Sequence, residues 1–183
     1  LEYKRLGGTL DDAAGEAFDK VARLLNLGYP GGPAIQHTAE HGNSEAIHFP
    51  RALMDNSWDF SFSGLKTAVL RIVNDFKQKN LELPVEDIAA SFQAAVVDVL
   101  VTKAIRGVEV TGAKSMLLAG GVSANKALRE TILAKSPVPV FIPPFKFCTD
   151  NAAMIASAGY YRYIQENPDV MGMDVRPSWR LSS

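Results

Sequence analysis

The sequence contains a single cysteine, Cys148, so the chain cannot form an internal disulfide bond. One thiol in 183 residues fits a reducing compartment, and we expect a cytoplasmic protein. No unbroken apolar run approaches the roughly 18–20 residues that cross a membrane, so we expect no membrane partner. A net charge of −1 means that any site for a nucleic acid or another polyanion must be a local patch.

Hydrophobic residues make up 47% of the chain and charged residues 21%, which is typical of a globular domain with a buried core. Hydrophobic spacing predicts helices over residues 9–28, 63–76, 84–112, 123–135 and 149–165, and strands over residues 1–6, 45–50, 58–62, 115–119 and 138–142. The expected caps are Thr9, Ser63, Ser123 and Thr149 at helix starts and Gly28 at a helix end. From residue 84 onward the alternation of helices and strands predicts an α/β domain with a parallel sheet.

Two glycines, Gly120 and Gly121, lie between an expected buried strand and a helix start. Glycines let a backbone approach a ligand closely, and the free N–H groups of a helix start attract anions. Ser123 and Asn125 add polar side chains at the same place. The pattern is typical of a phosphate-binding turn, and equally of a plain strand-to-helix turn with a serine cap.

Two carboxylates also have two interpretations. Asp150 could complement the dipole of the last helix, or it could bind a metal or a metal-bound phosphate at the carboxyl edge of the sheet. Asp19 could simply lie on the wet face of an amphipathic helix. The glycines of residues 29–33 (Tyr-Pro-Gly-Gly-Pro) could form only a rigid turn or could admit a ligand.

Five segments in order along nearly the whole chain resemble one family. They are residues 11–20 (Asp-Asp-Ala-Ala-Gly-Glu-Ala-Phe-Asp-Lys), 29–33, 59–67 (Asp-Phe-Ser-Phe-Ser-Gly-Leu-Lys-Thr), 119–125 (Ala-Gly-Gly-Val-Ser-Ala-Asn) and 148–151 (Cys-Thr-Asp-Asn). Together they resemble the bacterial tRNA adenosine threonylcarbamoyltransferases, which older names call glycoproteases or O-sialoglycoprotein endopeptidases.

The resemblance implies an actin/sugar-kinase/acetate-kinase-like α/β fold, with two ribonuclease-H-like lobes around a nucleotide cleft. Residues 1–183 would then be a single incomplete lobe, mostly the second of two, lacking its start and the first lobe. The implied reaction moves a threonylcarbamoyl group from threonylcarbamoyl-adenylate to the exocyclic amine of the adenosine 3′ of the anticodon. The implied partners are tRNA, the adenylate, a paralogous scaffold protein and an ATPase.

The resemblance also assigns roles to particular residues. Substrate or nucleotide contacts fall on Asp19, Gly32, Gly120, Gly121 and Asn125, with Gln36 as a weaker candidate for a ribose contact. The metal ligand falls on Asp150, for one divalent metal, iron ahead of zinc or magnesium, and the nucleotide would be ATP or an adenylate. The segment from Ser63 to Lys66 is characteristic of the family and receives no chemical role.

The metal site of the family also uses two histidines at His-x-x-x-His spacing in a first half that this sequence lacks. His37 and His41 have that spacing but follow the Pro-Gly-Gly turn, where the metal pair of the family does not lie. Glu40 does not match the His-Glu-x-x-His pattern, and two exposed histidines are the better interpretation. Because one aspartate rarely holds a metal alone, we expect this chain by itself to bind metal poorly and to be inactive.

Three alternatives accompany the transferase hypothesis. An inactive paralogue of the same fold could serve as a dimer scaffold, although Asp19, Asn125 and Asp150 together argue against one, since a scaffold has no need of all three. A metalloprotease, as the older names suggest, lacks a visible His-Glu-x-x-His helix. A small-molecule kinase of the same superfamily stays open, because a glycine turn serves any nucleotide.

Overall fold

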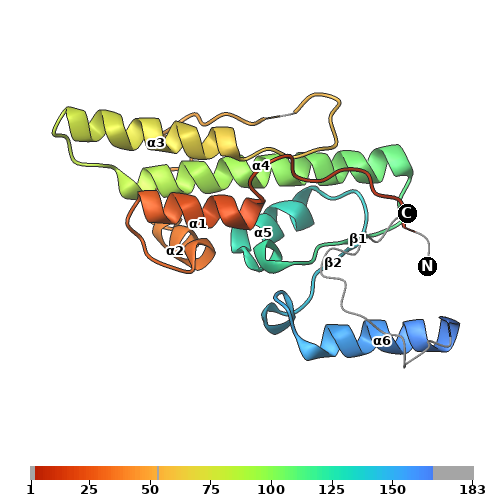
Figure 1. Ribbon diagram of the computed structural model, residues 1–183. Coiled ribbons are helices and arrows are strands. Elements are labelled where there is room, and N and C mark those ends of the chain that lie inside the picture. Colours follow the sequence, from red (N-terminus) through yellow and green to blue (C-terminus); the bar gives the residue numbers. More distant parts are fainter. Residues whose placement is uncertain (1–2, 53, 167–183) are drawn as a thin grey trace.

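The computed structural model describes residues 3–52 and 54–166 of the chain. Its helices are α1 (Ala14–Leu24), α2 (Gly31–Ala39), α3 (Ser63–Gln78), α4 (Val85–Thr111), α5 (Lys126–Lys135) and α6 (Ala152–Glu166). Two short strands, β1 (Met116–Leu117) and β2 (Val140–Phe141), and two 3-10 turns, Gly121–Ala124 and Phe145–Phe147, complete the regular structure. Figure 1 shows α4 running through the body of the fold, with α6 set apart from it.

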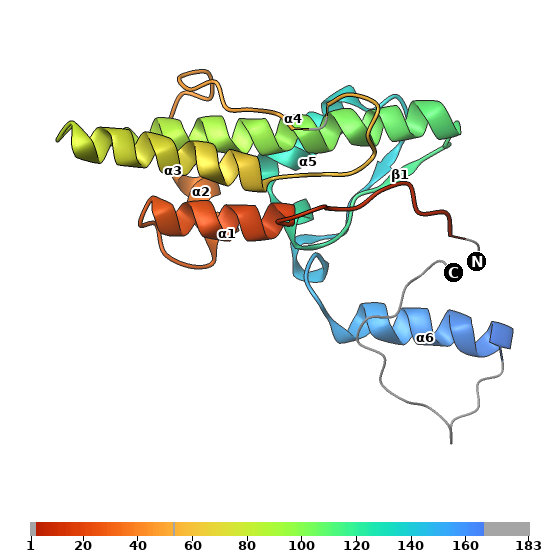
Figure 2. The same ribbon diagram turned by 45° about the horizontal axis from the view of Figure 1, so that its top comes forward.

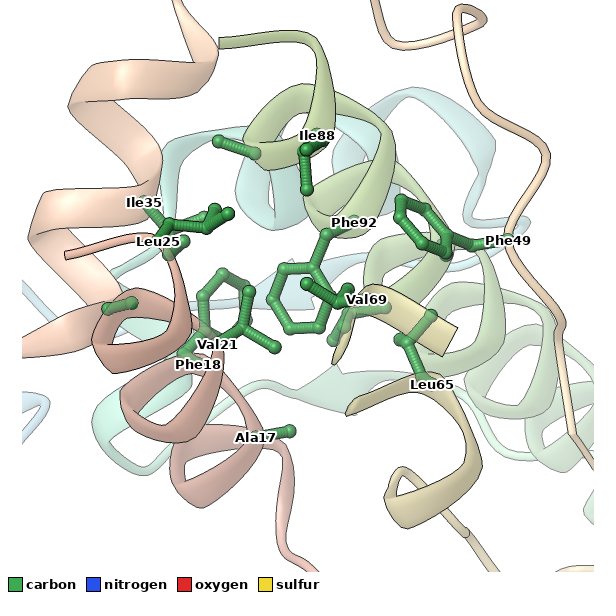
Figure 3. Packing of buried hydrophobic residues seen from close by; sticks show 14 of the residues in the cluster. Ala17, Phe18, Val21, Leu25, Ile35, Phe49, Leu65, Val69, Ile88 and Phe92 are labelled. Carbon is green, nitrogen blue, oxygen red and sulfur yellow. The ribbon is translucent and has the colours of Figure 1, made fainter. Parts of the chain in front are cut away.

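The main core lies where α1, α2 and α3 meet α4, and the views of Figures 1 and 2 agree on this arrangement. Phe18 of α1 and Phe92 of α4 meet edge to face at its centre, with ring centroids 5.2 Å apart. Figure 3 shows the aliphatic side chains Val21, Ile35 and Val69 around this pair. Edge-to-face aromatic packing adds to the stabilisation from burial, so this pair contributes to the contact between α1 and α4.

The expected long helix over residues 84–112 is confirmed as α4, which follows Pro84 and ends at Gly112 in the left-handed conformation (φ 64°). By length and composition α4 could span a membrane, but 61% of its apolar 18-residue stretch is buried inside the fold. Ile88 and Phe92 have no exposed surface at all. The apolar character of α4 therefore reflects a core helix that is covered on several sides.

The two strands pair in parallel, as predicted, with Met116 opposite Val140 and Leu117 opposite Phe141. Met116 and Val140 pack against a small second core between α4 and α5. Leu117 and Phe141 are 72% and 61% exposed, because none of the described elements covers their face of the sheet. The expectation of a fully buried strand is therefore wrong: the apolar run has one covered and one open face.

The other three expected strands do not form among the described residues. Residues 3–6 and 45–50 are irregular, and Leu1 and Glu2 lie outside the described part of the chain. Residues 58–62 make one parallel bridge, from Thr9 to Phe60. The ammonium of Lys103 on α4, which donates to backbone carbonyls of residues 57 and 59, holds this segment against the helix instead of in a sheet.

Several helix ends differ from the expected caps. The Thr9 hydroxyl donates to carbonyls of the loop before α1, and α1 has no side-chain cap at its start. Its end is a Schellman motif built on Asn26 (φ 59°) rather than on Gly28, with the N–H of Asn26 bonded to Arg23 and the N–H of Leu27 to Ala22. Asparagine tolerates this backbone conformation, so the helix closes two residues earlier than glycine alone predicts.

Candidate functional site

A hollow of about 740 Å³ lies between α1, the start of α2, the turn Gly121–Ala124 and the loop before α6. Its volume falls in the range of small-molecule sites, roughly 300–1,000 Å³. Five residues that the sequence analysis assigned to a ligand share its lining: Asp19, Gly32, Gln36, Gly121 and Asn125. They come from segments up to about a hundred residues apart, so the fold, rather than local sequence, brings them together.

Asp19 of α1 caps the neighbouring helix α2. Its Oδ1 accepts the N–H of Gly31, the first residue of α2, at 2.8 Å. Pro30 precedes that residue and makes no side-chain cap, so a carboxylate from another helix satisfies the free N–H. Residues 29–33 are therefore more than a rigid turn, the first of the two interpretations above, because a helix already begins at Gly31.

The two glycines at the start of α2 have different surroundings. A Cβ at Gly31 would lie 2.5 Å from the Cα of Asp19 and 2.7 Å from the carbonyl oxygen of Phe18, so only glycine lets α1 and α2 approach this closely. A Cβ at Gly32 would have no atom within 4 Å, and Gly32 lines the hollow. Gly31 thus permits the helix contact, whereas Gly32 leaves open space beside first-turn N–H groups that have no partner within the helix.

Two amide side chains bind the first turn of α5. Asn125 is its cap: its Oδ1 accepts the N–H of Leu128 at 2.9 Å, and its Nδ2 donates to Oε1 of Gln93 on α4 at 2.7 Å. The Oε1 of Gln36 on α2 accepts the N–H of Lys126 at 2.7 Å. The wall of the hollow at this point is a network that joins α2, α4 and α5.

The glycine turn is tighter than expected. Gly120 has a φ of 90°, a conformation that favours glycine, and residues Gly121–Ala124 then form a 3-10 turn before α5 begins at Lys126. Ser123 is not the cap, since Asn125 takes that role, and the Ser123 hydroxyl is buried without a hydrogen-bond partner in the described structure. Gly121 lines the 740 Å³ hollow, but Gly120 lines a neighbouring one of about 530 Å³.

Asp150 lies in this second hollow with Gly120, while Thr149 lines both hollows. The helix α6 is capped by Asn151, whose Oδ1 accepts the N–H of Met154 at 3.0 Å, and not by Thr149. Asp150 is exposed to solvent and has no capping role.

In the part of the chain that the structure describes, no three side chains of His, Cys, Asp or Glu come together as metal ligands. His37 and His41 stack edge to face with ring centroids 5.8 Å apart, and Glu40 lies 3.7 Å from His37. The side chain of His37 is 81% exposed. Neither this pair nor Asp150 alone supplies a donor set that fits a metal ion.

The segment Ser63 to Lys66, which had no role in the sequence analysis, begins α3, and Asp11 caps that helix from 52 residues away. Partial burial raises the pKa of Asp11, but the hydroxyls of Ser61 and Ser63 and the N–H groups of Phe62 and Ser63 hold it well below its usual value. The hydroxyl contacts measure 2.5 and 2.6 Å. Two of the family-like segments therefore support each other structurally.

Sequence reasoning missed two polar residues that shape the hollow. Gln93 holds Asn125, and Arg129 of α5 bonds the carbonyl of Ser123 at 2.5 Å and reaches the loop before α6. A polar residue inside an apolar helix, such as Gln93 directly after the buried Phe92, is a signal that could have revealed the first of them.

Comparison with known proteins places the chain in a family. The family model of the tRNA N6-adenosine threonylcarbamoyltransferases matches residues 1–157 of this chain. The tRNA N6-adenosine threonylcarbamoyltransferase of Clostridioides difficile strain 630 is 51% identical over 185 residues, which cover 99% of this chain and 55% of that protein. The Dehalococcoides mccartyi strain BAV1 protein of the same name is 53% identical over 182 residues, covering 100% of this chain and 54% of that protein. The chain thus spans about half the length of these relatives.

A solved structure shares the fold. The crystal structure of T. kodakarensis HypF superposes with a TM-score of 0.57 and 19% sequence identity, over 81% of this chain and 20% of that one. Together with the family match, this likeness confirms the expected α/β fold of the actin/sugar-kinase-like, ribonuclease-H-like type. At this level of identity the superposition concerns the fold alone.

Proposed function

Because this chain belongs to the tRNA N6-adenosine threonylcarbamoyltransferase family, we propose that it forms one wall of that enzyme's active site. The reaction moves a threonylcarbamoyl group from threonylcarbamoyl-adenylate to the exocyclic amine of the adenosine 3′ of the anticodon. The observation that carries the proposal is the 740 Å³ hollow with Asp19, Gly32 and Asn125 in its lining. The opposite wall is supplied by polypeptide that corresponds to the other half of the relatives.

The lining suits an adenylate. Pro33, Val122 and Phe145 give the hollow apolar surface for a purine ring. One oxygen of Asp19 bonds Gly31, and the second oxygen is the acceptor for a ribose hydroxyl. The start of α2 at Gly32 offers backbone N–H groups and the positive end of a helix dipole to the phosphate.

In the transfer itself, the amine nitrogen of the tRNA adenosine attacks the carbamoyl carbon of the adenylate. A carbon–nitrogen bond forms, the bond from that carbon to the phosphate oxygen breaks, the amine gives up a proton and AMP leaves. The residues of this chain act on the leaving group, because the hollow orients the adenosine part and the N–H groups stabilise the charge on the departing phosphate.

Asp150 is proposed as one ligand of a divalent metal, iron ahead of zinc or magnesium, whose other ligands come from outside this chain. The described residues contain no further ligands beside it, and so no step of the transfer is assigned to a metal. The proposed partners are tRNA, threonylcarbamoyl-adenylate, a paralogous scaffold protein and an ATPase, and the proposed location is the cytoplasm.

The test uses the full-length protein that carries this chain, with its bacterial partners, threonine, bicarbonate, ATP and unmodified tRNA. Asp19→Asn keeps an oxygen that can cap α2 but removes the charge, and we expect at least about a tenfold loss of modified nucleoside, measured by mass spectrometry. Asp75→Asn, an equal charge change at an exposed position of α3, is the control and should retain full activity. Full product from a folded Asp19→Asn variant would refute the proposed role of this hollow.

Asp150→Ala tests the metal proposal in the same assay. Loss of product together with loss of bound metal, measured by elemental analysis, is the expected result. A variant that keeps both its metal and its activity would remove Asp150 from the ligand set.

A further inference from the structure

Arg129 of α5 lies between the glycine turn and the loop that leads to α6. Its Nε donates to the carbonyl oxygen of Ser123 at 2.5 Å. Its Nη2 donates to the carbonyl oxygen of Pro143 at 2.8 Å and lies 3.0 Å from the sulfur of Cys148. The guanidinium carbon stands 4.1 Å from the centroid of the Phe145 ring. One side chain therefore contacts the turn and three successive parts of the loop.

The loop over residues 143–149 forms a wall that the two hollows share. Phe145 and Thr149 line the hollow that contains Asp19, whereas Cys148 and Thr149 line the hollow that contains Asp150. A small displacement of this loop would change the shape of both.

The hydrogen bonds of the loop's own backbone run within it, from Phe147 to Pro144 and from Cys148 to Phe145. Among the described residues that precede β2, Arg129 is the one whose hydrogen bonds reach this loop. The hydrogen bonds that join this loop to the glycine turn therefore come from a single guanidinium. A planar group with five N–H donors and a face for ring stacking suits this task, and a lysine cannot reproduce it.

We propose that Arg129 is a positioning residue, which fixes the loop 143–149 against the turn Gly121–Ala124 and so sets the shape of the ligand site. The inference rests on the proposed function only for the identity of the ligand. The clamp, by which we mean the bonds from Arg129 to Ser123, Pro143 and Cys148, consists of contacts within this chain. It can therefore be tested without a ligand.

Cys148 provides that test, because it is the one cysteine of the 183-residue chain and is only 3% exposed. Its rate of reaction with a disulfide reagent such as dithionitrobenzoate reports how often the loop opens. We expect Arg129→Ala to raise this rate at least about tenfold, since bonds from a charged donor are lost. Arg129→Lys should give an intermediate rate, because lysine keeps the charge and can still bond one carbonyl.

Lys135→Ala is the matched control: it removes the same charge from the last turn of the same helix, at an exposed position with no hydrogen bond or ion pair to the loop among the described residues. Its thiol rate should equal that of the unmodified chain. Circular dichroism and thermal melting separate local opening from global unfolding. Equal thiol rates in the unmodified chain and in a cooperatively melting Arg129→Ala would overturn the proposal. If Arg129→Ala does not melt cooperatively, the thiol reaction rate of Arg129→Lys is used instead. A rate for Arg129→Lys equal to that of Lys135→Ala would then refute the proposal that Arg129 positions the loop.

ATP serves as the probe for the link to the ligand site. In the full-length protein the reaction is followed on the peptide that contains Cys148, by mass spectrometry. We expect saturating ATP to slow it in the protein without substitutions, and to do so only at higher concentration in Arg129→Ala. If ATP does not slow the reaction of Cys148 in the protein without substitutions, that result counts against the proposed function. The reaction rates without ATP would still test the positioning role of Arg129. Protection with the same midpoint in both proteins would overturn the positioning role.

Discussion

The two adjacent glycines at the start of α2 give the sharpest prediction, because the same substitution should have opposite effects at them. In Gly31→Ala the new methyl group would meet the backbone of α1, with the Cα of Asp19 at 2.5 Å and its nitrogen at 2.8 Å. Backbone atoms cannot rotate away as side chains can, so α1 and α2 must separate. The separation also stretches the hydrogen bond from Gly31 to Asp19.

The expected cost follows from these two effects. Overpacking a close contact costs about 1–3 kcal/mol, and loss of a helix cap adds about 1 kcal/mol. A domain of this size loses roughly 2–4 °C of melting temperature for each kcal/mol. We therefore expect Gly31→Ala to melt roughly 4–16 °C below the unmodified protein.

Gly32→Ala places its methyl group in open space, since no atom lies within 4 Å of that position. Alanine favours a helix over glycine by about 0.5–1 kcal/mol, so the melting temperature should stay equal or rise slightly. The same methyl group would occupy part of the hollow, and we expect ATP to bind about tenfold more weakly, a loss of about 1.4 kcal/mol.

Differential scanning calorimetry and isothermal titration with ATP, both on the full-length protein, measure the two quantities. An equal loss of stability in both variants would refute the different roles of the glycines. Unchanged ATP affinity in Gly32→Ala would show that the ligand does not approach the start of α2.

Three further predictions concern stability, each measured by urea unfolding. Asp11→Ala should lower the free energy of unfolding by about 1–2 kcal/mol at pH 7. This deficit should shrink as the pH falls from the ordinary pKa of an aspartate towards the lowered pKa of Asp11, because a depressed carboxyl pKa stabilises the fold fully only above the ordinary value. Asn125→Ala should cost about 1–2 kcal/mol, and Asn125→Asp should recover most of it, since an aspartate caps equally well and Gln93 can turn its amide. Lys103→Met should cost about 1–3 kcal/mol, because it leaves two loop carbonyls without a donor.

The helices were predictable where hydrophobic spacing runs over several turns. The long helices α3 and α4 each present apolar residues at helical spacing, and Pro84 and Gly112 mark the ends of α4. The short apolar runs did not allow the strands to be predicted. A few alternating apolar residues also occur in an irregular segment whose large side chains enter a core. Phe49 and Phe62 are both buried in this way without belonging to a strand.

The caps escaped sequence reasoning for a different reason. Capping rules consider residues within about one turn of a helix end, yet Asp19 caps a helix 12 residues further along, and Asp11 caps one 52 residues away. Likewise Gly120 and Gly121 are neighbours in sequence but line different hollows, since the backbone turns at Gly120. The packing of the helices determines which residue caps which helix and which glycine lines which hollow.

The caps also change which residues argue for a ligand. Asp19 and Asn125 hold the starts of α2 and α5, so a scaffold that binds no nucleotide would need them as well, and their presence does not argue against a scaffold. Gly32 is different, because a Cβ there would have no atom within 4 Å, so packing does not require glycine at this position. Gly64 of α3 and Gly159 of α6 have the same open surroundings, so open space alone does not single out Gly32. What distinguishes Gly32 from these two is that it lines the 740 Å³ hollow, and the ATP affinity of Gly32→Ala is therefore the measurement that decides between a ligand site and a plain scaffold.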